Sequence, residues 1–386
     1  MARLGDVFNL QMGKTPARAN ATYWTNGTNA WVSIADLSGY EKYVGDTKEQ
    51  ITDLAVQESG IKAVPADTII MSFKLSLGKT AITKVPIYTN EAIMAFLPTG
   101  KYDVCPDYFF HLFSGRDWSE GTNRAVMGAT LNKATLSNME VVIPPLEEQR
   151  RIAAVLDKVS DLIAKRREQL DKLDELVKAR FVEMFGDPVS NPHQYPINQL
   201  SEYIEFLTSG SRGWSQYFSD DGEYFITIKN VKNCSISLED VQYIKPPDNA
   251  EAVRTRVKNG DLLISITADL GRTGVVTKEI ADHGAYINQH LTCIRLNREK
   301  LNPLYVAYYM ESPAGKMQFN AKNQAGVKAG LNFNAINSLK LVVPPLEKQG
   351  LFVEFVSQTD KSKLTIRQSL DKLEVLKKAL MQQYFG

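Results

Sequence analysis

One nine-residue phrase occurs twice in this chain, with its two copies 200 positions apart. VVIPPLEEQ ends at Gln149, and LVVPPLEKQ ends at Gln349. The match continues beyond the phrase, because residues 144–186 align with residues 344–386 without a gap. It also extends backward, from LNKATLSNMEVVIPP in the first copy to LNFNAINSLKLVVPP in the second. The chain is therefore an internal duplication, and its fold must accommodate two copies of one unit.

The C-terminal part of each copy, which we call its back, is the part that the two copies share most closely, and it has the pattern of a long helix. Its apolar residues recur at alternating steps of four and three, which is a heptad seam. The seam residues are Ile152, Leu156, Val159, Ile163, Leu170, Leu173, Val177 and Met184 in the first copy, and Phe352, Val356, Ile366, Leu370, Leu373, Leu380 and Tyr384 in the second. Thr359, Lys363 and Lys377 interrupt the second seam. Each Pro-Pro pair favours a helix start just after it, and the Phe-Gly pairs favour a stop.

The N-terminal parts of the two copies, which we call the fronts, differ more in sequence than the backs. Both contain short apolar runs, such as DTIIMSF and DLLISIT, separated by Gly, Asn and Asp turns. This punctuation is typical of mixed sheets with some helices. The predicted fold class is α+β, with two globular α/β-mixed domains separated by two long helices that form an antiparallel coiled coil, in a pseudo-twofold internal repeat. The alternative for the helices is an ordinary solvated hairpin. The predicted boundaries are 1–146 for the first domain, 147–187 for the first spacer helix, 188–346 for the second domain and 347–386 for the second spacer helix.

Bulk composition restricts the function only weakly. The 45 Lys and Arg residues against 44 Asp and Glu residues give a net charge of +1, so any basic surface must be local. The three cysteines are far apart and lack the spacing of a disulfide framework or a zinc site. No stretch resembles a signal peptide or a membrane span, so we expect a cytoplasmic protein with no membrane partner.

Common catalytic motifs are missing from the sequence. MGKT and LGKT lack the glycine that a phosphate-binding loop requires, because Phe8 and Phe73 stand there. The four histidines are isolated from one another and from any GxSxG serine. We therefore expect no catalytic residue and no metal site, although the pattern leaves open a nuclease with scattered carboxylates.

Candidate DNA-contacting residues lie in loops that lack carboxylates. The loop around LGKT corresponds to the loop around LGRT, and the segments before each Pro-Pro pair are rich in Asn, Gln, Ser and Thr. Lys and Arg suit phosphate contacts, while Asn, Gln and Arg can read base edges. Ordinary solvated loops are the alternative interpretation. The candidates are Lys14, Arg18, Lys74, Ser76, Lys79, Arg124, Asn132, Lys133, Ser211, Arg212, Arg272, Lys322, Gln324, Lys328, Asn332 and Asn334.

The doubled phrase, the heptad helices after it and FGDP at residues 185–188 resemble the specificity subunit of a type I restriction-modification system. The resemblance covers essentially the whole chain. It implies two target-recognition domains, each reading one half of a split site in double-stranded DNA, with the helices as spacer. It also implies that two modification (methyltransferase) subunits dock at the proline junctions. The implied docking residues are Pro144, Pro145, Leu146, Glu147, Gln149, Pro344, Pro345, Leu346, Glu347 and Gln349.

The resemblance assigns the chemistry to partner subunits. S-adenosylmethionine would bind to the methyltransferase, which methylates adenine N6. ATP and Mg²⁺ would bind to two restriction subunits where these are present. This chain would hold no cofactor and would not be an enzyme.

Helix length and repeat divergence add expectations of their own. A helix from Gln149 to Met184 is roughly 50 Å long and spans about 15 base pairs, so the half-sites should lie about one turn or slightly more apart. Because the fronts differ, the two half-sites should differ as well. Lys348 and Gly350 replace Glu148 and Arg150, which predicts unequal docking faces. The competing functions are a stand-alone DNA-modifying or DNA-cleaving enzyme and a coiled-coil adaptor that does not bind DNA.

Overall fold

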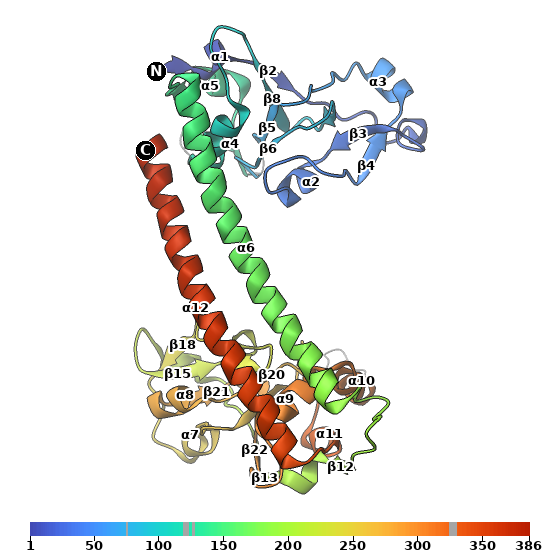
Figure 1. Cartoon of the computed structure of the whole chain (residues 1–386), viewed down its shortest axis with the longest axis vertical. Helices are drawn as coiled ribbons and strands as arrows, with labels where there is room; N and C mark the ends of the chain where they lie inside the picture. The colour runs from blue at the N-terminus through green and yellow to red at the C-terminus, as the bar shows by residue number, and fades with distance from the viewer. Residues whose placement is uncertain (75, 119–122, 126–127, 324–329) are drawn as a thin grey trace. The chain divides into compact units, whose positions relative to one another are not determined.

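A computed structural model of the chain divides into two compact units (Figure 1). The structure describes residues 1–74, 76–118, 123–125, 128–323 and 330–386. Unit 1 comprises Met1–Arg167 and Arg367–Gly386, and unit 2 comprises Glu168–Ile366. Each unit therefore contains one front domain together with part of both long helices. The four predicted domains follow the sequence repeat, whereas the border between the units crosses the middle of each helix.

The two long helices are α6 (Leu146–Phe185) and α12 (Leu346–Phe385), each of 40 residues (Figure 1). They run antiparallel within each unit. In unit 2, Asp174 of α6 forms an ion pair with Lys363 of α12 at 2.6 Å, while Phe181 of α6 packs against Phe352 at 5.4 Å between ring centroids. A later residue of α6 thus meets an earlier residue of α12. The predicted pairing direction of the helices is confirmed.

The central sheet has the same strand order in both fronts. In unit 1 the antiparallel sheet is ordered β2-β8-β5-β6, and in unit 2 it is ordered β13-β22-β19-β20. Its strands are β2 (Phe8–Met12), β5 (Ile69–Ser72), β6 (Thr80–Ile82) and β8 (Ile93–Pro98), and then β13 (Ile204–Ser209), β19 (Leu262–Ser265), β20 (Thr273–Val275) and β22 (Leu291–Leu296). The duplication therefore extends through the fronts, where the sequence match fades.

A second sheet in each front differs between the two copies. Unit 1 has the three-stranded order β4-β3-β7, and unit 2 has the four-stranded order β14-β18-β15-β21. The strands are β3 (Asn29–Val32), β4 (Glu49–Ile51) and β7 (Tyr88–Thr89), and then β14 (Phe218–Ser219), β15 (Glu223–Ile226), β18 (Gln242–Ile244) and β21 (Ala285–Ile287). The fronts thus combine a shared sheet with a divergent one.

The remaining elements cover these sheets and connect them. Short two-stranded ladders are formed by β1 (Ala2–Arg3) with β11 (Glu140–Val141), β9 (Asn123–Ala125) with β10 (Gly128–Thr130), β12 (Ile197–Gln199) with β23 (Lys340–Val342), and β16 (Val231–Lys232) with β17 (Ser235–Ile236). The shorter α-helices are α1 (Leu4–Val7), α2 (Ile34–Gly39), α3 (Asp53–Ser59), α4 (Pro106–Gly115), α5 (Lys133–Asn138), α7 (Ala250–Thr255), α8 (Lys278–His283), α9 (Pro303–Glu311), α10 (Pro313–Lys322) and α11 (Phe333–Asn337).

Each front domain shares its core with the ends of both long helices. In unit 1, Leu156 of α6 and Phe385 of α12 join the cluster that contains Phe8 and Phe109. In unit 2, Phe181 and Phe352 join the cluster that contains the sheet residues of β19 and β22. Burial of apolar surface is the main stabilising term in folding, so each helix end is held by a domain core. This sharing explains why the compact units include helix ends.

Two lysines in the seam of α12 lie close to charged residues of α6. The side chain of Lys363 is only 11% exposed and pairs with Asp174 at 2.6 Å. Burial, followed by the charge of Arg167, lowers the pKa of Lys377 in unit 1. The predicted interruptions at these positions therefore lie in the helix interface. Among the described residues, no helix is both long and apolar enough to cross a membrane.

Candidate nucleic-acid interface

The antiparallel order of the central sheet gathers several candidate loops at one of its ends. In unit 1, Met12 pairs with Met94, Ser72 pairs with Ile93, and Met71 pairs with Thr80. The chain therefore leaves β2, enters β8, leaves β5 and enters β6 at the same end of the sheet. We call this end of the strands in each central sheet the loop end. Unit 2 has the same arrangement, because β13, β19, β20 and β22 pair in the same order.

The LGKT and LGRT loops at the loop end have the same hydrogen bonds. In unit 1 the Ser72 hydroxyl donates to the Ser76 carbonyl and accepts from the N–H of Lys79 at 3.0 Å. In unit 2 the Ser265 hydroxyl donates to the Asp269 carbonyl and accepts from the N–H of Arg272 at 2.9 Å. We call residues 72–80 and 265–273 the serine-anchored loops.

The segment before each short helix α5 or α11 joins its serine-anchored loop. The N–H of Leu131 donates to the Phe73 carbonyl at 3.0 Å, and the N–H of Leu331 donates to the Ile266 carbonyl at 2.8 Å. Asn132 and Lys133 therefore follow a segment that is bound to the start of the loop carrying Lys74, Ser76 and Lys79 in unit 1, and Asn332 and Asn334 follow a segment bound to the start of the loop carrying Arg272 in unit 2. These candidates, scattered in sequence, lie together at the loop ends.

Asn132 and Asn332 have a structural role that the sequence analysis did not assign. Their side-chain oxygens accept the N–H of Thr135 and of Ala335, each at 2.8 Å, and so cap α5 and α11. The side chains are exposed, but their acceptor oxygens are occupied. Lys322 donates to the Ser338 hydroxyl at 2.7 Å, which ties α10 to the end of α11.

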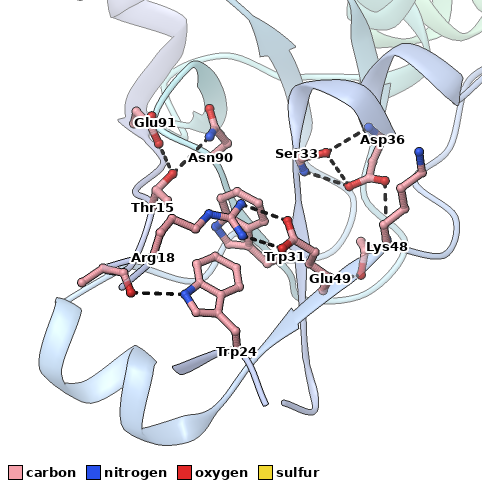
Figure 2. A network of polar contacts seen from close by, with 12 residues as sticks. Thr15, Arg18, Trp24, Trp31, Ser33, Asp36, Lys48, Glu49, Asn90 and Glu91 are labelled. Carbon is pink, nitrogen blue, oxygen red and sulfur yellow. Dashed lines mark hydrogen bonds and ion pairs between the residues drawn. The ribbon is translucent and has the colours of Figure 1, made fainter. Parts of the chain in front are cut away.

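Arg18 is held against two indole rings in unit 1 (Figure 2). Its guanidinium lies 3.8 Å from the ring centre of Trp24 and 4.9 Å from that of Trp31, and it forms a bidentate ion pair with Glu49. The hydrogen bond to Glu49 raises the pKa of Arg18 despite its partial burial. Half of the Arg18 side chain is exposed to solvent. Trp31 is buried and serves as a core anchor.

Lys14 and Ser211 occupy equivalent backbone positions. The N–H of Lys14 donates to the Thr89 carbonyl at 2.8 Å, and the N–H of Ser211 donates to the Ile287 carbonyl at 2.9 Å. Lys14 is exposed, and its ammonium group donates to the Ser59 carbonyl.

In unit 2 the Ser211 side chain points into the interior of the protein. Ser211 is 2% exposed, and its hydroxyl shares a hydrogen bond with Thr255 at 3.1 Å. Its selection as a DNA contact is therefore corrected, because the hydroxyl is enclosed. The next residue, Arg212, is exposed and donates to the Gln289 side chain.

Gln324 and Lys328 lie outside the residues that the structure describes. Arg124 belongs to β9, whose backbone pairs with β10.

At the proline junctions, exposed residues surround a buried glutamine. Gln149 is fully buried, accepts the N–H of Cys105 at 2.9 Å, and donates to the carbonyls of Asp103 and Pro144, each at 2.9 Å. Gln349 is equally buried, accepts the N–H of Asn302 at 2.8 Å, and donates to the Pro344 carbonyl at 2.8 Å.

These contacts correct part of the predicted docking set. The side chains of Gln149, Gln349 and Pro344 lie inside the protein, so they hold the junction in place and present no surface. The exposed members are Pro145, Glu147, Pro345, Leu346 and Glu347, whereas Pro144 and Leu146 are half-buried. Lys348 donates to the Tyr195 hydroxyl at 2.9 Å, a contact that distinguishes the second junction from the first.

A partly buried charge cluster ties α6 to the front of unit 1. Asp157 accepts from the Lys42 ammonium at 2.6 and 2.7 Å and contacts the His111 ring nitrogen at 2.8 Å. Burial alone would raise the pKa of Asp157, but the hydrogen bonds from His111 and Lys42 outweigh it and hold that pKa below its usual value. The charged carboxylate therefore stabilises the fold.

The Asp157→Asn variant should lose about 2 kcal/mol of unfolding free energy at neutral pH, less than for a fully buried pair because Asp157 is one-third exposed. The folded-state pKa is depressed, so this stability is present above the unfolded pKa of about 3.9 and is lost as pH falls through the folded value. Urea unfolding of both proteins from pH 7 to pH 3 measures the difference. A gap that stays constant below pH 4 would contradict the assignment.

The family comparison matches both copies of the repeat. The model of the Type I restriction modification DNA specificity domain matches residues 1–174 and 216–376. The chain belongs to this family. The first matched segment contains the whole central sheet of unit 1, and the second contains β19, β20 and β22 of unit 2 but begins after β13. Both matched segments contain a serine-anchored loop and a proline junction.

Curated relatives of this family member are specificity subunits. The EcoprrI specificity subunit of Escherichia coli is 23% identical over 363 residues, which cover 90% of this chain and 84% of the relative. The MjaIX specificity subunit of Methanocaldococcus jannaschii is 28% identical over 260 residues, or 62% of this chain and 59% of the relative. The match thus spans less than two-thirds of the archaeal subunit.

Solved structures agree with the fold. A chain from a study of complex assembly and conformational transition of the type I R-M system has a TM-score of 0.62 at 19% identity, with 100% of this chain and 96% of that chain covered. The type I restriction-modification S subunit from M. genitalium has a TM-score of 0.55 at 13% identity, with 100% and 95% covered. At these identities the likeness concerns the fold alone.

Proposed function

We propose that this specificity-family chain reads a split, asymmetric site in double-stranded DNA, with one half-site bound by each front domain. The carrying observation is that both fronts present polar and basic loops at the same end of the same sheet. The shared sheet supplies one scaffold twice, while the second sheet and the loop sequences differ between the copies. Two versions of one scaffold with different loops suit two different half-sites.

The proposal assigns spacing and assembly to the conserved backs. The paired helices α6 and α12 set the unread gap between half-sites. The exposed residues around the two proline junctions dock two methyltransferase subunits, which bring S-adenosylmethionine. Two restriction subunits with ATP and Mg²⁺ complete the complex where they are present. Near-neutral net charge favours weak DNA binding by the free chain, because phosphate neutralisation supplies much of the affinity.

Exchange of one front domain tests this assignment. Residues 1–143 are replaced by the corresponding domain of another specificity subunit, and the chimera is co-expressed with the methyltransferase subunit. Direct sequencing of modified adenines should then show one half-site changed and the other retained. The matched chimera, with residues 188–343 replaced, should change the opposite half-site. A change in both halves from one exchange would contradict the assignment.

Two further results would contradict the proposal more broadly. Turnover of DNA by the purified chain alone, with Mg²⁺ or S-adenosylmethionine, would favour a stand-alone enzyme. A co-expressed complex without sequence-specific DNA retention would favour a coiled-coil adaptor.

A further inference from the structure

Each serine-anchored loop borders a surface hollow in its own unit. The hollow in unit 1 has a volume of about 330 Å³ and is lined by Leu77, Gly78 and Lys79 of the loop. The hollow in unit 2 has a volume of about 310 Å³ and is lined by Leu270, Gly271 and Arg272, the corresponding loop residues. The duplication has therefore produced two hollows of similar size at equivalent places.

The shape of both hollows depends on a glycine packed against an aromatic ring. Gly78 has a φ of +79°, and an added Cβ would lie 2.5 Å from Trp118 Cδ1. Gly271 has a φ of +77°, and an added Cβ would lie 2.3 Å from Phe319 Cδ2. A side chain at either glycine would face both a left-handed backbone and a clash. The two loops thus have a common, tightly fixed conformation.

Cations outnumber carboxylates among the described lining residues of each hollow. Lys79 and Arg116 line the first hollow together with Glu41. The second is lined by three cations and two carboxylates, namely Lys232, Arg272, Lys316, Asp269 and Glu311.

Both carboxylates of the second hollow have partners within the unit. Asp269 forms an ion pair with Arg272. Glu311 accepts the N–H of Thr273 at 2.9 Å. Lys79 and Lys316 form no ion pair with any residue that the structure describes. Each hollow therefore offers an ammonium group that can take an anion without breaking an ion pair seen in these residues.

We propose that both hollows bind backbone phosphates of DNA, and that this contact does not depend on the base sequence. The inference rests on the proposed function. Two domains that read different half-sites need different base contacts, whereas the phosphodiester backbone is the same in both half-sites. Both hollows have the same loop geometry and an excess of cations. Such a repeated site suits the phosphodiester backbone, which is the part of the DNA that the two half-sites have in common. The lining leucines Leu77 and Leu270 pack toward the cores.

Lys79→Gln and Lys316→Gln test the inference in the assembled complex with methyltransferase subunits. Affinity is measured at several salt concentrations on a duplex carrying the site that the unaltered complex methylates and on a scrambled duplex. Each variant should reduce the slope of log affinity against log salt by about 0.9, the value for one phosphate contact. Binding to both duplexes should weaken by a similar factor, and the methylated sequence should stay the same.

Lys101→Gln and Lys300→Gln are matched controls, because each removes one exposed lysine from the same unit outside the hollow. Equal slopes for test and control variants would overturn the inference. A changed methylation sequence would show base reading, and weakened subunit assembly with unaltered DNA affinity would show a partner surface; either would overturn it. The proposed function fails separately, if the unaltered complex does not distinguish the two duplexes. Thermal unfolding verifies that each variant is folded.

Discussion

Replacing Gln149 by leucine is expected to lower the unfolding free energy of unit 1 by about 3 kcal/mol. The buried amide accepts one backbone N–H and donates to two carbonyls, each at 2.9 Å. Leucine fills a similar volume but leaves those three backbone groups without their partner, at about 1 kcal/mol or more each. Urea unfolding followed by hydrogen exchange, which resolves the two units, measures the loss.

Gln349→Leu provides the matched comparison in unit 2. Gln349 makes two such bonds, to Asn302 and Pro344, so its replacement should cost about 2 kcal/mol and should affect unit 2. The exposed neighbour Arg150 serves as the surface control, and Arg150→Leu should change stability by less than about 0.5 kcal/mol. Equal stabilities for Gln149→Leu and Arg150→Leu would show that the buried amide does not hold the junction.

The long helices were predictable because their signals are local. A Pro-Pro pair, a heptad seam and a terminal Phe-Gly define α6 and α12 without reference to the rest of the fold. The antiparallel direction followed from the duplication itself. The sharing of each helix between two cores was not predictable, because it depends on contacts such as Tyr108 with Phe385, which are distant in sequence.

The repeat of the fronts is clearer in the structure than in the sequence for a physical reason. Side chains diverge freely where backbone hydrogen bonds carry the structure, so the central sheets share their order with few shared residues. The serine-anchored loops kept a visible match, since Ser72, Gly78 and their counterparts have conformational roles that few residues can replace. The two loops are 193 positions apart, whereas the backs are 200 positions apart. A gapless alignment of the two copies therefore does not bring the loops together.

The orientation of polar side chains was harder to predict from the sequence than their position in the fold. The loop candidates lie together because the sheet order brings them to one end, which agrees with the sequence reasoning on their correspondence. The inward turn of Ser211 and of Gln149 was missed, because serine and glutamine are polar in either environment. Asn is a preferred N-cap residue, so the capping role of Asn132 could have been read from the sequence. The DNA and docking roles of the exposed residues stay predictions.

A heptad inserted into both long helices is expected to lengthen the unread gap by about three base pairs. Seven residues add ~10 Å of helix, and a base pair occupies roughly 3.4 Å along the duplex. The insertion points are the borders between the compact units, after Arg167 in α6 and after Ile366 in α12. Contacts inside each unit are then retained, including Lys363 with Asp174 and Arg167 with Glu374. Sequencing of modified adenines in cells that express the variant and the methyltransferase reads both half-sites and their gap.

A heptad inserted into α6 alone is the matched control. Seven residues keep the seam in phase with itself, so only the double insertion extends both helices equally and preserves their antiparallel pairing. The single insertion lengthens α6 but not α12, so α6 must bulge or the contacts between α6 and α12 must be lost. Methylation should then fall to background. An unchanged gap in the double variant would show that the helices do not set the spacing. A longer gap with altered half-sites would show instead that base reading depends on how the helices hold each domain.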